Sequence, residues 1–363
     1  MNLGVDKLDK NMKTETNVEG FVFYDATKAP FAMYGTHKEE GADSLLRMPS
    51  KDAEKVSTAV HVMNRYTSGG RLRFKTDAKK IAVKGYMSTW HDGCNSSKFS
   101  RSGFDFYSRE NGEYIYIGAT STPLEFTGGA FESVANLKKS DAEMRDITMY
   151  MPIANPVTDL YIGVPEGAIL EVADEYTCKL KPVVYYGSSI TMGMGAGRPG
   201  TIYQGFICRR FDWDFLNLGF SGNAKGEPAM AEYVAGLEMS VFVLDYDHNA
   251  PNPEYLKETQ MNFYKTVRKA QPDLPIIMCS RPVANLLQGD DKARFEALWD
   301  NYQQGLAAGD KNLYFIKGFE MFVPGLEQDS IADGSHPNDI GYYGMGKKIG
   351  DLLAEIKKTL DKK

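Results

Sequence analysis

The sequence has few cysteines and no recognisable metal-binding pattern. Among its 363 residues there are four cysteines, at positions far apart in the chain: Cys94, Cys178, Cys208 and Cys279. With no Cys-x-x-Cys pair, this spacing argues against a zinc cluster or a disulfide framework and is typical of unpaired thiols. Histidine, aspartate and glutamate form no group with the spacing of metal ligands. We therefore expect no bound metal.

Long apolar runs are also missing. No stretch approaches the roughly 20 apolar residues that cross a bilayer. The first 20 residues lack the apolar core of a signal peptide. We expect a cytoplasmic protein without a membrane partner; a leader trimmed from the chain would instead make it a secreted one.

Positive charge is in slight deficit. Lysine and arginine number 42 against 48 aspartates and glutamates, a net charge of −6. Recognition of phosphates requires a concentrated basic face, and short clusters such as Lys79–Lys80 are better explained as solvated surface. A nucleic-acid partner is therefore not expected. At roughly 150 residues per domain, the length suggests about two domains.

The first half of the chain consists of short β-rich runs between turns. In the segment around Arg71–Phe74, Leu72 and Phe74 face one way and the arginines the other. Turn signals such as Ser-Gly-Gly (68–70) and Glu-Asn-Gly (110–112) separate the runs. The expected strands are residues 58–66, 71–76, 80–87, 103–108, 114–118, 146–152 and 160–164. This pattern predicts an antiparallel, jelly-roll-like β-sandwich domain over residues 17–180.

From residue 181 to residue 363, strands alternate with helices. Short runs that are apolar throughout are typical of strands covered on both faces. They occupy residues 183–186, 215–218, 241–244, 276–278 and 313–316. Helical patterns follow Asn252 and span 293–306 and 341–358. The pattern predicts an α/β domain with a parallel, doubly wound sheet, in which ligands bind beyond the carboxyl ends of the strands.

Residues suited to acyl transfer follow these strands directly. Ser189 comes after the first strand, and Asp333 and His336 lie on a loop beyond the fifth. A serine hydroxyl needs an adjacent base, and an aspartate three residues before a histidine can orient its ring. Considered alone, His336 is better explained as a loop residue that caps the last helix; the match to the other three elements reverses that balance.

Three groups are candidates to stabilise a developing oxyanion. They are the backbone N–H of Ser189, the backbone N–H of Gly222 after the second strand, and the side-chain amide of Asn249 after the third. Glycine allows positive φ and close approach. Taken singly, Gly222 and Asn249 are better explained as a turn glycine and a loop asparagine.

Four segments resemble the signature blocks of the SGNH/GDSL hydrolases. They are Gly-Ser-Ser-Ile-Thr (187–191), Asn-Leu-Gly-Phe-Ser-Gly-Asn (217–223), Asn249 and Asp-Gly-Ser-His-Pro-Asn (333–338). The resemblance implies that Ser189 is the nucleophile, that Gly222 and Asn249 complete the oxyanion hole, that His336 is the base and that Asp333 orients it. It implies no cofactor.

The resemblance has two departures. Ser188 stands where the commonest pattern has aspartate, and the third block reads Asp-Tyr-Asp-His-Asn (245–249) instead of Gly-x-Asn-Asp. Residues 64–74 and Asp-Leu-Tyr (159–161) resemble the β-sandwich domain that precedes some bacterial SGNH esterases. This architecture is similar to that of two-domain carbohydrate esterases, which implies an acetylated oligosaccharide or another small ester as substrate.

Three further residues are candidates for substrate binding. Arg281 follows the fourth strand and suits a carboxylate or a sugar hydroxyl, although a surface ion pair explains it equally well. His248 either lines the acyl pocket or packs beside it. Trp90 stacks on a sugar ring or belongs to the rim of the sandwich core.

Taken together, these features predict a serine esterase that removes short acyl groups, most simply O-acetyl, from carbohydrate. A lipase, lysophospholipase or thioesterase of the same fold would need a long apolar groove, whereas the residues near Ser189 are polar and glycine-rich. A carbohydrate-binding protein without catalysis would not need Ser189, Asp333 and His336. The sequence leaves the oligomeric state open, and a homo-oligomer is compatible with it.

Overall fold

The computed structural model describes residues 13–93, 95–138, 143–283 and 289–362. The chain divides into two compact units. The first comprises residues up to Leu46, Arg65–Glu175 and Arg198–Gly200, and the second comprises Arg47–Asn64, Tyr176–Gly197 and the chain from Thr201 onward. Residues 47–64, which the sequence pattern places in the N-terminal domain, thus belong to the second unit.

The first unit contains two antiparallel sheets. One has the order β1 (Phe21–Asp25), β11 (Thr158–Pro165), β6 (Lys80–Met87) and β9 (Gly129–Asn136). The other has the order β12 (Leu170–Glu171), β5 (Arg71–Thr76), β10 (Arg145–Tyr150), β7 (Gly103–Glu110) and β8 (Glu113–Ser121), with β2 (Ala32–Tyr34) beside β5. A small ribbon of β3 (His37–Lys38) and β4 (Leu45–Leu46) and the short helix α4 (Lys98–Ser102) complete the unit.

Both sheets contribute to one apolar core. Leu72 and Phe74 on β5 pair with Met149 and Ile147 on β10, and all four side chains are buried. Residues of β6, β9 and β11 from the other sheet join the same cluster. The alternation seen in the sequence therefore places one face of each sheet inside, and the predicted antiparallel sandwich is confirmed.

One predicted strand of this half is wrong. Residues 58–66 do not extend; they begin with helix α3 (Thr58–Met63), which follows helix α2 (Ser50–Val56). Ser57 caps α3 by accepting a hydrogen bond of 3.1 Å from the Val60 N–H. A run of six residues fits either a strand or a short helix by hydrophobicity alone. In the structure the segment is helical, and its residue Val60 is buried in the core of the second unit.

The second unit is built on a five-stranded sheet, and its strand pairs are all parallel. Its order is β14 (Phe215–Gly219), β13 (Val183–Gly187), β15 (Val241–Asp245), β16 (Ile276–Cys279) and β17 (Leu313–Ile316). The order changes direction at β13, which lies between β14 and β15. In such sheets this switch point is where ligands bind. The predicted parallel sheet is confirmed.

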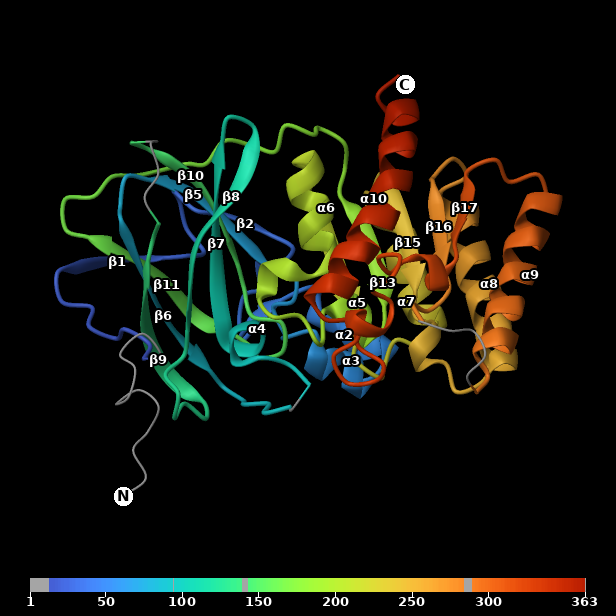
Figure 1. Cartoon of the computed structure of the whole chain (residues 1–363), viewed down its shortest axis with the longest axis horizontal. Coiled ribbons are helices and arrows are strands. Elements are labelled where there is room, and N and C mark those ends of the chain that lie inside the picture. Colours follow the sequence, from blue (N-terminus) through green and yellow to red (C-terminus); the bar gives the residue numbers. More distant parts are fainter. Residues whose placement is uncertain (1–12, 94, 139–142, 284–288, 363) are drawn as a thin grey trace. The chain divides into compact units, whose positions relative to one another are not determined.

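Helices cover both faces of this sheet, as in a doubly wound fold (Figure 1). The helices are α5 (Ser189–Met192), α6 (Tyr203–Phe211), α7 (Pro228–Ala235), α8 (Pro253–Ala270), α9 (Asp291–Ala307) and α10 (Asp339–Leu360). Short 3-10 turns span Pro199–Thr201, Asp247–Asn249, Gly318–Glu320 and Gln328–Ser330. Helices α2, α3, α7, α8 and α9 share a buried cluster with one sheet face, whereas α6 and α10 pack together on the other.

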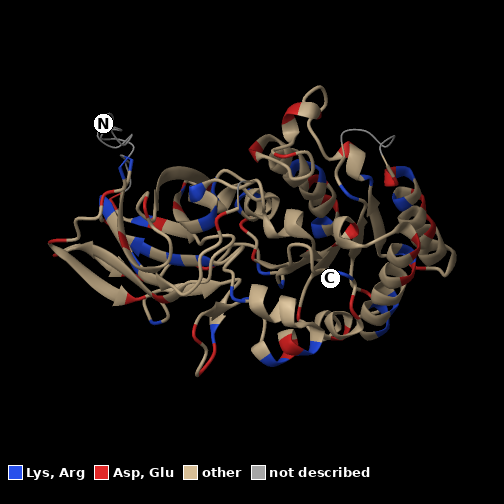
Figure 2. Cartoon of the chain, turned by 90° about the horizontal axis from the view of Figure 1, so that it is seen from below, with Lys and Arg blue, Asp and Glu red and all other residues tan. Residues whose placement is uncertain are grey.

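Charge and cysteine are distributed without a dominant feature. Basic positions are interspersed with acidic ones along the described elements of both units (Figure 2), as the nearly balanced counts imply. Cys178, Cys208 and Cys279 are buried and form no disulfide with one another, and Cys94 lies outside the described residues. Within the described chain, none of the helices combines the length and apolarity needed to cross a membrane.

Candidate active site

Ser189 lies on a tight turn between β13 and α5. Gly187 ends the strand, and the Ser188 side chain caps the helix by accepting a hydrogen bond from the Ile190 N–H at 3.2 Å. A Cβ atom on Gly187 would approach the Thr191 hydroxyl to 2.0 Å, so glycine is required there. The turn places Ser189 at the first position of the helix, with 8% of its surface exposed.

His336 connects Ser189 to Asp333. Its Nε2 lies 2.9 Å from the Ser189 Oγ, and its Nδ1 lies 2.7 Å from the Asp333 Oδ2. Because an ionised carboxylate only accepts hydrogen bonds, Asp333 favours a proton on Nδ1. The Nε2 lone pair is then free to accept the serine hydroxyl. The structure therefore brings the three residues together in the order that the sequence predicts.

Asp333 is held as a carboxylate. Burial acts to raise its pKa, but hydrogen bonds from the backbone and ring of His336 and from the Ser335 N–H prevail, and the pKa falls to about 2. The second carboxylate oxygen accepts the His336 N–H at 2.9 Å and the Ser335 N–H at 3.2 Å. The aspartate consequently orders the backbone of the loop as well as the imidazole ring.

The loop that carries His336 is fixed on both sides. The His336 carbonyl accepts a hydrogen bond of 2.7 Å from the Ala332 N–H. Asn338 caps α10 by accepting from the Ile340 and Gly341 N–H groups. The alternative explanation of His336 as the cap of the last helix is therefore wrong, because Asn338 has that position.

The loops that carry the expected oxyanion donors are tied to the serine turn. The Phe220 N–H donates to the Gly187 carbonyl at 2.9 Å, and the Asn249 amide donates to the Phe220 carbonyl at 3.0 Å. An amide has two hydrogens, so one of those on Asn249 stays available. Gly222 has a φ of +70°, which favours glycine.

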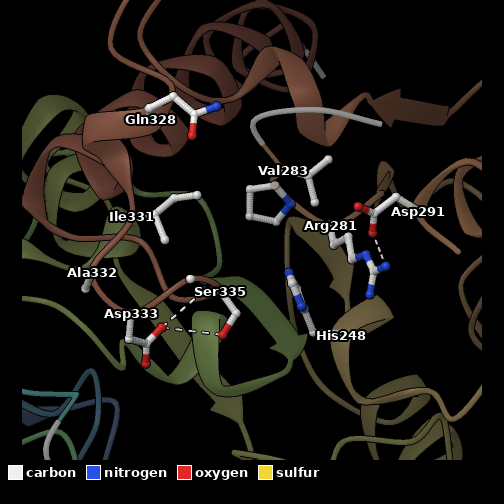
Figure 3. Close-up of a pocket in the computed structure, with 11 residues that line it drawn as sticks. His248, Arg281, Val283, Asp291, Gln328, Ile331, Ala332, Asp333 and Ser335 are labelled. Carbon is white, nitrogen blue, oxygen red and sulfur yellow. Dashed lines mark hydrogen bonds and ion pairs between the residues drawn. The ribbon is translucent and has the colours of Figure 1, made fainter. Parts of the chain in front are cut away.

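A cavity of about 610 Å³ lies beside Asp333. Its lining is mostly polar (Figure 3) and comprises His248, Arg281, Pro282, Val283, Asp291, Gln328 and Ile331–Ser335. Two of the candidate substrate-binding residues, His248 and Arg281, thus face the same space. Trp90 is in the first unit, where it is half-buried and packs edge-on against Phe126 with ring centroids 5.4 Å apart.

His248 is a neutral imidazole. Burial, together with the charges of Arg281, His336 and Arg294, lowers its pKa to about 3. Its Nε2 atom is closed to solvent and has no hydrogen-bond partner among the described residues. The His248 ring is therefore uncharged and places no additional charge beside the imidazole of His336.

Arg281 forms ion pairs with carboxylates. Its guanidinium contacts Asp291 and lies 2.9 Å from the Asp290 carboxylate, and its backbone N–H donates to Asp247 at 2.9 Å. Because its charge is neutralised, Arg281 is better placed to supply a hydrogen bond to a neutral group than to hold an anion. This outcome matches the ion-pair alternative, with Arg281 as a wall of the cavity.

Sequence reasoning missed the residues that support the site. Asn217 donates to the Thr191 carbonyl at 2.7 Å and accepts from the Gly219 N–H at 2.8 Å. Asn217 stands inside a recognised block, so that signal was present. Arg47 contacts the same strand end but lies in no motif.

Within the described part of the chain, histidine, cysteine, aspartate and glutamate form no group able to hold a metal.

Two family models match the chain over consecutive regions. Residues 180–354 match the GDSL-like lipase/acylhydrolase family, and residues 21–170 match the N-terminus of SGNH-hydrolase-type esterases. No curated protein sequence matches significantly.

Solved structures extend the likeness over both units. A protein assigned as a GDSL-like lipase from Bacteroides ovatus shares 26% identity over 93% of this chain and 98% of its own, with a TM-score of 0.82. A salicylyl acyltransferase from a tetracycline biosynthetic pathway shares 18% (94% and 99% covered, TM-score 0.75). An acetyl xylan esterase from Butyrivibrio proteoclasticus shares 12% (92% and 98% covered, TM-score 0.58). The chain therefore belongs to the SGNH/GDSL hydrolases, as an esterase with an N-terminal β-sandwich.

Proposed function

We propose that the protein is a serine esterase that removes short acyl groups, O-acetyl foremost, from carbohydrate. The observation that carries the proposal is the hydrogen-bonded series of Ser189, His336 and Asp333, with heavy-atom distances of 2.9 and 2.7 Å. These separations lie within the reach that proton transfer between a nucleophile and its base requires.

In the first half-reaction, Ser189 Oγ attacks the ester carbonyl carbon while His336 Nε2 takes the hydroxyl proton. The carbonyl oxygen becomes negative and accepts hydrogen bonds from the N–H groups of Ser189 and Gly222 and from the Asn249 amide. When the intermediate collapses, the carbon–oxygen bond to the alcohol breaks. His336 returns its proton to the departing oxygen, and the acyl group stays on Ser189.

In the second half-reaction, water replaces the alcohol. His336 Nε2 takes a proton from the water as it attacks the acyl carbon, and the same donors hold the oxyanion. Collapse releases the carboxylic acid, and His336 returns the proton to Ser189 Oγ. Asp333 stays ionised and balances the positive charge on the imidazolium in both halves. The chain's own residues supply every step.

The cavity supports a hydroxylated substrate. Gln328 and Ser335 offer it donors and acceptors, whereas Val283, Ile331 and Ala332 supply only short apolar surface. Such a lining suits a sugar better than a long acyl chain. Two fold neighbours are by name an acetyl xylan esterase and a family two carbohydrate esterase from Clostridium thermocellum, which agrees with this choice.

A series of esters tests the proposal. We expect p-nitrophenyl acetate to be hydrolysed faster than the butyrate and much faster than the octanoate, and acetate to be released from acetylated xylo-oligosaccharides. Preference for octanoate would favour a lipase, and preference for an acyl thioester a thioesterase. Binding of the oligosaccharides without turnover of any ester would favour a non-catalytic carbohydrate-binding protein.

Replacing Asn249 with alanine should lower kcat for p-nitrophenyl acetate by about 10²–10³-fold, because one oxyanion donor is lost. KM should change little, since the contact strengthens only in the transition state. Steady-state kinetics measure both constants.

Asn252→Ala is the matched control for this substitution. Asn252 caps α8 by accepting from the Tyr255 N–H at 2.8 Å, so its removal costs roughly 1 kcal/mol of stability without touching the site. An unchanged kcat in Asn249→Ala, or an equal fall in both variants, would remove Asn249 from the oxyanion hole.

A further inference from the structure

Arg47 is buried beneath the loop that follows β14. Only 2% of its surface is exposed. Its guanidinium donates hydrogen bonds to three backbone carbonyls: those of Gly219 at 2.6 Å, Met63 at 2.7 Å and Asn217 at 3.1 Å. It also lies 4.6 Å from the centre of the Phe220 ring. Several parts of one planar group thus fix a single stretch of backbone, Asn217–Phe220.

That stretch connects the expected oxyanion donors. The Phe220 N–H binds the Gly187 carbonyl, two residues before Ser189, and the Phe220 carbonyl accepts the Asn249 amide at 3.0 Å. Gly222 follows two residues later in the same loop. A shift of Phe220 would therefore move both Gly222 and Asn249 relative to the Ser189 hydroxyl.

Arg47 is itself held in place by Asn64. The Arg47 N–H donates to the Asn64 backbone and side-chain oxygens, both at 3.1 Å, and the Asn64 amide donates to the Met48 carbonyl at 2.7 Å. These bonds join the two ends of segment 47–64, whose residue Val60 packs in the core of the second unit. The segment lies outside the residues that match the hydrolase family model, 180–354.

We propose that Arg47 is a positioning residue for the esterase site, through which segment 47–64 fixes the Gly219–Gly222 loop and with it the oxyanion donors Gly222 and Asn249. The inference rests on the hydrolytic function proposed above. Since the contacts of Arg47 run through backbone carbonyls, its effect should appear in transition-state stabilisation and not in substrate affinity.

The test replaces Arg47 with methionine and with lysine. Methionine keeps the length and apolar stem but removes every donor, whereas lysine keeps the charge and some of the donors. For p-nitrophenyl acetate we expect Arg47→Met to lower kcat by roughly tenfold to a hundredfold with KM changed by less than about threefold, and Arg47→Lys to retain part of the lost rate.

Arg268→Met is the matched control. Arg268 also binds backbone carbonyls, those of Gln271, Pro272 and Leu274 at 3.0, 3.0 and 2.6 Å. It lies near the carboxyl end of α8, which leads to the amino end of β16, whereas the candidate site lies beyond the carboxyl ends of the strands. We expect this variant to lose thermal stability while keeping kcat per folded molecule. Equal kcat losses in both methionine variants, or a wild-type kcat in Arg47→Met, would overturn the proposal.

Labelling with a fluorophosphonate separates this inference from the esterase proposal. The reagent reacts with an activated serine and places an oxygen where the oxyanion forms. If wild type hydrolyses no ester and Ser189 is not labelled, the proposed function fails and the role of Arg47 fails with it. If wild type is labelled, Arg47→Met should be labelled roughly tenfold or more slowly, and an equal rate would contradict the positioning role alone. Should the methionine variant not fold, the same comparison is made with Arg47→Lys.

Discussion

Ser189→Ala is expected to lower kcat for p-nitrophenyl acetate by roughly 10⁴–10⁶-fold, to the rate left by the remaining groups. The hydroxyl oxygen is the atom that forms the acyl-enzyme, and alanine has no nucleophilic atom in its place. Its Oγ lies 2.9 Å from His336 Nε2 and is the hydroxyl paired with that nitrogen. The measurement is steady-state hydrolysis, with labelling by a fluorophosphonate as an independent count of active serines.

Ser240→Ala provides the control for that loss. Ser240 directly precedes β15, so it lies at the amino end of the strand, whereas the candidate site lies beyond the carboxyl ends. The same chemical change there should leave kcat and labelling unaltered. Hydrolysis that persists in Ser189→Ala at more than about one per cent of wild type would exclude the serine mechanism. Absence of ester turnover in the wild-type protein would instead favour the binding-protein alternative.

The local pattern predicted the central elements of both units well, because burial of their side chains follows the period of each element. Strands β5, β6 and β17 have the expected bounds, and α8 begins at Pro253 directly after Asn252 as its cap signal indicates. A strand that is covered on both faces appears in the sequence as a run of apolar residues, so it can be recognised from the local sequence alone.

The misassigned segment shows where this reasoning fails. Thr58–Met63 has an apolar character that suits a strand or a helix. Its place is decided by the buried cluster that Val60 shares with residues more than a hundred positions away, such as Phe220 and Met230. Strand β9 was not anticipated for a different reason. Gly129, Ser133 and Asn136 interrupt its apolar pattern, and pairing with β6 supplies the order.

The same distinction applies to the residues of the site: those with a local sequence signal could be predicted, and those placed by distant contacts could not. Ser189, Asp333 and His336 could be predicted because each follows a strand or lies in a short local block whose chemistry is specific. Arg47 could not, because an arginine between a short strand and a helix has no local signature. Its role depends on the carbonyls of Asn217 and Gly219, which the fold alone brings to it.

Asp333→Asn is expected to lower kcat by roughly 10⁴-fold with little change in KM. An asparagine amide can donate to Nδ1, so the imidazole proton moves to Nε2, and that nitrogen can no longer accept the Ser189 proton. The imidazolium formed during attack also loses the negative charge that lies 2.7 Å away. Asp329→Asn in the same loop is the control. The contact of Asp329 with Asn338 is made by its backbone carbonyl, which the substitution keeps, so this variant should retain the wild-type kcat.

The pH dependence of stability tests the same carboxylate independently of turnover. Its folded pKa of about 2 lies below the ordinary aspartate pKa of 3.8. Because the folded state holds the ionised form more strongly, Asp333 stabilises the protein fully above about pH 4 and loses this effect as the pH falls through about 2. Because Asp333 is partly exposed and solvent screens its charge, wild type should exceed Asp333→Asn in unfolding free energy by at most about 1 kcal/mol near neutral pH, and the difference should shrink below about pH 4. A stability difference that does not change with pH would mean that His336 and Ser335 do not hold the charge of Asp333. In the kinetic experiment, a kcat of Asp333→Asn within about tenfold of wild type would show that Asp333 has no part in catalysis.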